Sequence, residues 1–282
     1  MSEKLQKVLA NQGIGSRREM ERWIEQGRIS VNGQVATLGC RVEEDDEIRV
    51  DGRRIERSKE KSICRVLMYN KPEGEVCTRK DPEGRPTVFE RLPRISQGRW
   101  MSIGRLDINT SGLLLFTTDG ELANRLMHPS HEVERQYAVR IFGKVEDAVI
   151  NRLKRGVLLE DGEARFGEIR RHVQDEESIN QWFDVTLYEG RHREVRRLWE
   201  SQDLTVSRLI RTHYGGIGLA KRLPQGGFIE LGLKDVNHLR KQVQLPPEKE
   251  TLLKPDQQQL DHVRISRMRR AARKHQLKRK KD

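Results

Sequence analysis

The clearest pattern of polar and apolar positions lies in residues 104–120, GRLDINTSGLLLFTTDG. Small, polar, turn-forming residues lead into the apolar run 113–116, and Asp119 follows it closely. A short apolar run bounded by turn signals is typical of a strand buried on both faces, and an Asp at its end can cap a following helix. The pattern therefore predicts a tight loop carrying Arg105 and Asp107 at the mouth of a buried strand, a common setting for an active-site carboxylate.

The first 60 residues form a separate pattern. Apolar residues at helical spacing predict a short amphipathic helix over residues 4–11. A second helix opens at Ser16, which with Glu19 three positions later has the spacing of a capping box. A strand and turn are predicted over residues 28–33, and the polar stretch 57–62 is interpreted as a linker. These features predict a small domain over residues 1–60.

The remainder of the chain alternates predicted strands with predicted helices up to Pro246. Alternating or continuous apolar runs of strand length are separated by turn signals, and helical spacing recurs between them. Strands are predicted at residues 63–69, 134–141, 164–173, 182–187 and 206–211, and helices at 121–127, 145–155, 189–200 and 235–243. We therefore place a second domain at residues 61–245 and a tail at 246–282.

Charge is concentrated in that tail. The formal net charge is +12, and residues 263–282 hold ten Lys or Arg and one acid, which leaves only +3 for the other 262 residues. Basic arms of this kind often bind nucleic acid through its phosphates and are usually disordered when free. We interpret the tail as a disordered arm that contacts RNA, in preference to a plain solubilising tail.

Several classes of protein are disfavoured. No run of about 18 apolar residues predicts a transmembrane helix, and the N-terminus has no signal-peptide pattern. Three cysteines without metal-ligand spacing suit a reducing cytoplasm. His128 and His131 lack partners for a metal site. Because phosphate-binding loops, dinucleotide fingerprints and zinc spacings are also absent from the sequence, we expect neither cofactor nor metal.

Four stretches resemble, in order, the motifs of the pseudouridine synthases that modify ribosomal RNA: YNKPEG, GRLD with its Thr-Ser-Gly turn, ERQYAVRI and EGRHREVRRLWE. A lone Asp before a turn is usually a backbone cap, but this context favours catalysis. The resemblance implies that Asp107 is the catalytic residue, that Tyr137 stacks on the uracil, and that Arg196 pairs with Asp107. Arg105 is placed to fill the gap left by a flipped base. Lys71 is expected to shape the loop.

The stretch 4–34 resembles an S4 domain, a small RNA-binding module. Basic side chains near a helix N-terminus add their charge to free backbone N–H groups, and together these hold phosphates. The alternative is an ordinary solvated basic face. The candidate RNA-binding residues in this region are Lys4, Arg17, Arg18, Arg22 and Arg28.

Together the resemblances imply an α+β fold: an S4-type domain and a catalytic domain with a mixed, mainly antiparallel sheet and a central cleft. They imply a cytoplasmic enzyme, expected to be a monomer, that isomerises a uridine in large-subunit (23S) ribosomal RNA to pseudouridine. Two alternatives stay open: a non-catalytic S4-type RNA-binding or ribosome-assembly protein, and the same chemistry on small-subunit ribosomal RNA. The target uridine and the choice between a covalent adduct and proton abstraction also stay open.

Overall fold

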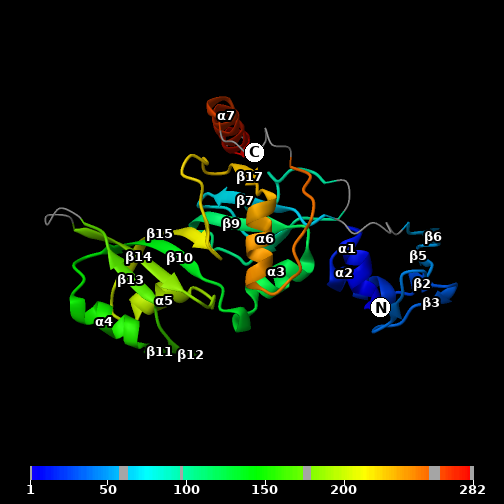
Figure 1. Cartoon of the computed structure of the whole chain (residues 1–282), viewed down its shortest axis with the longest axis horizontal. Helices are drawn as coiled ribbons and strands as arrows, with labels where there is room; N and C mark the ends of the chain where they lie inside the picture. The colour runs from blue at the N-terminus through cyan, green and yellow to red at the C-terminus, as the bar shows by residue number, and fades with distance from the viewer. Residues whose placement is uncertain (1, 57–62, 96–97, 174–178, 254–260, 280–282) are drawn as a thin grey trace. The chain divides into compact units, whose positions relative to one another are not determined.

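The computed structural model describes residues 2–56, 63–95, 98–173, 179–253 and 261–279 (Figure 1). The chain divides into two compact units. The first comprises Met1–Ile63 together with Pro93–Trp100, and the second comprises Cys64–Leu92 and Met101–Asp282. The sequence predicts a single boundary near residue 60, so the inclusion of 93–100 in the first unit is a difference. Within that unit Arg99 Nη1 donates a hydrogen bond to the carbonyl of Gly15 at 3.1 Å.

The first unit packs two helices with short strands. Its core consists of apolar side chains from the helices and strands, including Leu5, Leu9, Met20, Ile24 and Ile48. The predicted capping box is confirmed, because Glu19 N donates to Ser16 Oγ at 3.1 Å and Ser16 N donates to Glu19 Oε2 at 3.2 Å. The elements are α1 (Leu5–Asn11), α2 (Arg17–Glu25), the pair β1 (Glu3–Lys4) and β4 (Arg41–Val42), and a sheet in the order β3 (Gln34–Val35), β2 (Ile29–Val31), β5 (Ile48–Val50) and β6 (Arg53–Arg54).

The second unit is built on a nine-stranded sheet. Its main path runs β13 (Glu168–Arg171), β14 (Asn180–Leu187), β10 (Arg135–Phe142), β15 (Thr205–Tyr214), β9 (Ser111–Thr117), β7 (Val66–Lys71) and β17 (Phe228–Glu230), with β16 (Ile217–Gly218) beside β15 and β8 (Met101–Ile103) beside β9. The pairing of β9 with β15 is parallel, and the other described pairs of this sheet are antiparallel. The expected mixed, mainly antiparallel sheet is confirmed.

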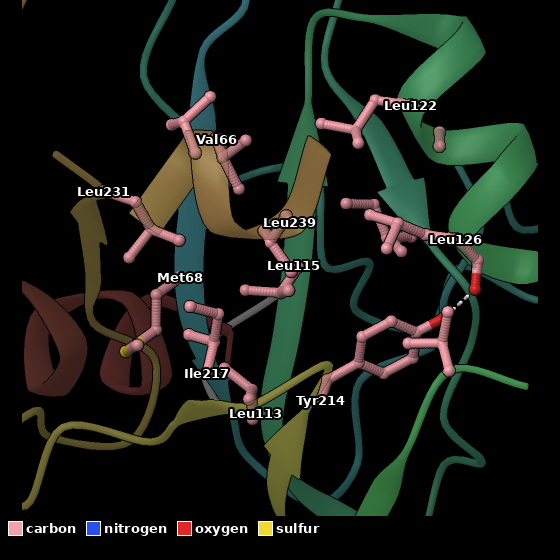
Figure 2. Close-up of a cluster of buried hydrophobic side chains, with 14 of the residues drawn as sticks. Val66, Met68, Leu113, Leu115, Leu122, Leu126, Tyr214, Ile217, Leu231 and Leu239 are labelled. Carbon is pink, nitrogen blue, oxygen red and sulfur yellow. Dashed lines mark hydrogen bonds between the residues drawn. The ribbon is translucent and has the colours of Figure 1, made fainter. Parts of the chain in front are cut away.

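Helices cover each half of the sheet separately. These are α3 (Gly120–Met127), α4 (Asp147–Arg155), α5 (Glu194–Glu200), α6 (Leu233–Gln242) and α7 (His262–Arg279), with the short 3₁₀ helix η1 (Pro129–His131) and the small ribbon β11 (Val157–Leu159) and β12 (Gly162–Ala164). Figure 2 shows Leu122 and Leu126 of α3 and Leu239 of α6 packed with Leu115 of β9. In the other half, Trp199 of α5 lies with its ring centroid 5.2 Å from that of Phe183.

Strand β9 is buried along its whole length, which confirms the sequence prediction. Its parallel ladder with β15 has only the residue pairs Ile210 with Ser111 and Arg211 with Gly112. Gly112 has φ +102°, and a Cβ there would lie 2.3 Å from the carbonyl oxygen of Arg211. The two halves of the sheet therefore meet at a position that requires glycine.

The basic tail differs from its prediction as a disordered segment, because helix α7 lies within it. Ile265 and Ala272 are buried, and Met268 packs against the core cluster of α3 and α6. These three residues follow helical spacing and form one apolar stripe. Burial of this stripe explains why an arginine-rich segment docks on the domain. Arg267, Arg269, Arg270 and Arg273 remain exposed.

Candidate active site

A cleft of about 760 Å³ opens where β9, β15 and β10 lie side by side. Arg105, Asp107 and Tyr137 all line it, so the structure brings together three of the four site residues predicted for this domain. Asp107 is half-buried, Arg105 is exposed, and Tyr137 on β10 is buried with its ring against the cleft. Because Asp107 is only half-buried and lines the cleft, its carboxylate can reach a nucleotide bound there.

The Asp107 loop is held from below by Lys71, the last residue of β7. Lys71 is fully buried, and its Nζ donates to the carbonyl oxygens of Pro72 at 3.0 Å, Asp107 at 3.0 Å and Thr110 at 2.8 Å. Burial lowers the pKa of this ammonium group. All three of its donors are satisfied by backbone. The prediction that Lys71 shapes the loop is confirmed.

Arg196 holds the same loop from α5. Its Nη2 donates to the carbonyl oxygen of Asn109 at 3.0 Å, and its Nη1 donates to that of Val206 at 2.9 Å. The direct ion pair with Asp107 expected from the sequence is not formed in this structure, since no nitrogen of Arg196 lies within 4.0 Å of the Asp107 carboxylate. Its two terminal guanidinium nitrogens donate to backbone carbonyls instead. Arg196 thus orients the loop through its backbone and contributes positive charge near Asp107.

Two buried arginines of the cleft were not predicted. Arg135 on β10 and Arg211 on β15 are both buried, and both line the cleft. Arg135 stands two positions before Tyr137, so strand alternation alone would have placed it on the same face. For Arg211 the sequence carries no such signal, because a β-bulge at Thr212 changes the alternation of β15.

The candidate RNA-binding residues of the first unit divide into two groups. Lys4, Arg17, Arg18 and Arg22 are exposed, and the first turn of α2 carries two of them. Arg28 is engaged within the protein: its Nε donates to Asp51 Oδ1 at 2.8 Å, and its guanidinium lies 4.1 Å from the centroid of the Trp23 ring. The expected charge of Arg28 toward RNA is therefore partly neutralised by Asp51.

The structure offers no metal centre within its described residues, where no group of three His, Cys, Asp or Glu side chains converges. His128 and His131 have ring centroids 6.4 Å apart, and His128 Nδ1 makes a hydrogen bond with Ser130 Oγ at 2.7 Å. In the same part of the chain, none of the helices has the length and apolar character needed to span a bilayer.

Comparison with known proteins matches both units to sequence families. The profile of the RNA pseudouridylate synthase family matches residues 65–201, and that of the S4 domain matches residues 3–48. Among solved structures, a crystal structure of a pseudouridylate synthase superposes with a TM-score of 0.58 at 26% identity, covering 84% of this chain and 99% of that one.

Curated relatives extend the similarity over most of the chain. The ribosomal large subunit pseudouridine synthase B of Pasteurella multocida is 63% identical over 89% of this chain and 73% of its own length. The enzymes of the same name from Vibrio cholerae and Escherichia coli (strain K12) are 59% and 58% identical, each over 98% of this chain and over 87% and 94% of their own lengths. The chain belongs to the RNA pseudouridylate synthase family and carries an S4 domain. It is therefore an isomerase that forms pseudouridine in RNA.

Proposed function

We propose that this enzyme isomerises a specific uridine of large-subunit (23S) ribosomal RNA to pseudouridine, using the carboxylate of Asp107 and no cofactor. The observation that carries the proposal is the cleft in which Asp107 is accessible beside Tyr137 and Arg105. The names of relatives up to 63% identical support the choice of RNA. The three free cysteines suit a cytoplasmic enzyme, which we propose acts as a monomer.

The reaction exchanges one bond to the sugar for another. The N1–C1′ bond of uridine breaks, a C5–C1′ bond forms, and the proton of C5 is lost as N1 gains one. A carboxylate suits the electron-poor sugar carbon that develops while the base is detached, as it does in glycosidases. In our proposal Asp107 acts on the sugar at C1′ or C2′, and Tyr137 stacks on the uracil so that the detached base can turn without leaving.

The other site residues prepare this geometry. Arg196 and Lys71 hold the loop of Asp107 through backbone carbonyls, so the carboxylate is oriented before substrate arrives. Arg105 is exposed two residues before Asp107 and fills the space left in the RNA by the flipped uridine. Exposed basic residues of the first unit and of α7 supply phosphate contacts.

A pseudouridine assay on deproteinised large-subunit ribosomal RNA with a chelator present tests the proposal. Wild-type enzyme should form pseudouridine at one site, and Asp107→Asn should lose activity by about 10⁴-fold or more, the scale of removing a group essential to the chemistry. Asp81→Asn is the matched control, because Asp81 also lines the cleft but is paired with Arg85 at 2.9 Å. It should retain most of the activity.

The alternatives predict other results. If wild type binds RNA but forms no product on any ribosomal RNA, the non-catalytic S4-type RNA-binding or assembly protein is favoured. Product on small-subunit ribosomal RNA alone would retain the chemistry and replace the substrate. Full turnover by Asp107→Asn would contradict the assignment of the carboxylate.

A further inference from the structure

The two buried arginines of the cleft present an electrostatic problem. Arg135 is 6% exposed and Arg211 is 2% exposed. No ion pair within 4.0 Å joins either of them to a carboxylate of the described residues, although sixteen Lys or Arg pairs with carboxylates are found elsewhere in that part of the chain. Buried charges are normally paired, because removing a lone ion from water costs several kcal/mol. Both side chains also line the cleft.

The sheet register explains how the arginines come together. Tyr137 is opposite Arg211, and Arg135 is opposite Tyr214, with a register shift between these pairs that leaves Thr212 as the extra residue of β15. Residues opposite each other in antiparallel strands share a face of the sheet. The bulge therefore puts Arg211 and Tyr214 on the face that carries Arg135 and Tyr137. All four side chains line the cleft.

Both guanidinium groups are fixed in place. Arg211 Nε donates to the carbonyl oxygen of Leu113 at 2.8 Å, and Arg135 Nη1 donates to that of Val133 at 2.7 Å. Their guanidinium carbons lie 5.0 and 5.1 Å from the centroid of the Tyr214 ring, whose hydroxyl donates to the carbonyl oxygen of Leu126 at 2.8 Å. Held this way, the arginines lose little further conformational entropy when a ligand binds.

One donor of this cluster has no partner. Arg211 Nη2 is buried and makes no hydrogen bond, whereas Lys71 on the other side of β9 uses its donors fully. Because Nη2 itself lies beneath the surface, a ligand can meet this guanidinium only on the side that lines the cleft. The charge has no ion-pair partner among the described residues, so an anionic acceptor on that side would stabilise it more than a neutral carbonyl of the base would.

We propose that Arg211, supported by the charge of Arg135, binds one phosphodiester of the RNA strand that flanks the target uridine. The proposal rests on the proposed function of the cleft and adds to it a specific anion site. The planar guanidinium matches phosphate oxygens. Because Arg211 is anchored to Leu113 in the strand that follows the Asp107 loop, a phosphate bound there sets the position of the attached sugar relative to Asp107.

The test removes the charge either from the arginine or from the RNA phosphate that it is proposed to bind. The probe is a short RNA stem-loop containing the modified uridine, made with ordinary phosphates or with one neutral methylphosphonate on the 5′ or the 3′ side of that uridine. Pseudouridine formation and equilibrium binding are measured with wild type, Arg211→Met, Arg211→Lys, Arg135→Met and the control Arg208→Met. Arg208 is an exposed arginine of the same strand.

Charge-assisted hydrogen bonds are worth about 1.5–3 kcal/mol, so Arg211→Met and the methylphosphonate at the contacted phosphate should each lower kcat/KM by roughly 10- to 100-fold. One of the two methylphosphonates should impair wild type, and Arg211→Met should impair turnover of ordinary RNA to a similar degree. Combined, the two changes should cost little more than one of them, because they break the same contact. Arg211→Lys should recover part of the loss, and Arg135→Met should show a smaller loss. Arg208→Met and the methylphosphonate should act independently, so the fold-changes that they cause in kcat/KM should multiply when the two are combined.

The proposal would be overturned if the kcat/KM of wild type changed by less than about threefold with both methylphosphonates. It would also be overturned if the losses from a methylphosphonate and from Arg211→Met multiplied when the two changes are combined. If Arg211→Met does not fold, the response of wild type and of Arg211→Lys to the methylphosphonates still tests the proposal. Lys keeps the positive charge but lacks the planar pair of donors of the guanidinium. Failure of the proposed function is separate: wild type would then be inactive on ordinary RNA, and the binding measurements alone would test the phosphate contact.

Discussion

Two buried cations flank β9, and the protein handles them in opposite ways. Lys71 is fully buried and donates to three backbone carbonyls, which fixes the loop of Asp107. Arg211 is 2% exposed, lines the cleft, donates to one carbonyl, and has a buried Nη2 without a hydrogen-bond partner. Lys71 is satisfied within the fold, and Arg211 is not.

The difference separates support from recognition. A buried charge whose donors are all used stabilises the fold, and its removal leaves several carbonyls without partners. A buried charge with an open donor costs folding free energy until a ligand completes it. Stability measurements on the protein without RNA should therefore distinguish the two positions, and the following predictions are ordered by the size of the expected effect.

The largest effect is expected for Lys71→Met. Three carbonyl oxygens in the Asp107 loop and its neighbour would lose their shared donor, at a cost of about 3 kcal/mol or more in the free energy of unfolding. Urea unfolding monitored by circular dichroism measures it. Lys80→Met, at an exposed position, is the control and should change stability by less than about 0.5 kcal/mol. Equal stability of both variants would contradict the supporting role of Lys71.

Gly112→Ala tests the junction on which both cations depend. A Cβ would lie 2.3 Å from the Arg211 carbonyl oxygen, at φ +102°, so we expect a loss of about 2–4 kcal/mol. Gly143→Ala separates the two causes, because Gly143 has φ +95° but no atom within 4 Å of its Cβ position. It should cost only about 1 kcal/mol of backbone strain. Matching losses at both sites would show that the close approach of the strands is unimportant.

Glu194 shows a third treatment of a buried charge, neutralisation by a proton. Burial, together with the neighbouring carboxylate of Glu189, raises the pKa of Glu194 from its usual 4.5 to about 7. The folded state then holds the proton more tightly than the unfolded state. The resulting stability is complete below pH 4.5 and is lost as the pH rises through 7, by on the order of 1 kcal/mol per pKa unit.

Glu194→Gln should therefore flatten the fall in stability between pH 4.5 and pH 7 that wild type shows. Thermal or urea unfolding across that interval measures the slope. Glu121→Gln, on a side chain 48% exposed, should retain the wild-type slope. An unchanged slope in Glu194→Gln would mean that another group takes up the proton.

The smallest effect is expected for Arg211→Met in the absence of RNA. The substitution removes an unpaired buried charge while it leaves the carbonyl of Leu113 without its donor. Because these contributions oppose each other, stability should stay within about 1 kcal/mol of wild type. A loss as large as that of Lys71→Met would place Arg211 among the structural cations and weaken the case for a ligand.

Local chemistry made much of this fold predictable. The burial of the middle of β9 follows from the apolar run 113–116, and the caps at Ser16 and Asp119 follow from side chains that suit helix N-termini. Asp107, Arg105 and Tyr137 meet in the cleft as their motif order implied. These features depend on neighbours within a few residues or on a motif that carries its own geometry.

Features that depend on distant packing were not predictable in the same way. The reach of Arg196 to Asn109 rather than to the Asp107 carboxylate depends on how α5 sits under the loop. The position of Arg211 in the cleft lining depends on a β-bulge that no residue type in the sequence predicts. The packing of α7 depends on three apolar residues in a segment that otherwise consists largely of arginines. The association of Pro93–Trp100 with the first unit brings together residues that are distant in the sequence.

The two-residue parallel ladder between β9 and β15 also determines when, during translation, the cleft can form. Gly112 and Arg211 are about 100 residues apart in the chain, which a ribosome needs roughly 5 to 20 seconds to traverse. During that interval the nascent chain already carries its S4 segment and the Asp107 loop, but the part of the cleft lining that β15 supplies has not been made. The S4 segment of each new molecule is therefore complete before its cleft can close.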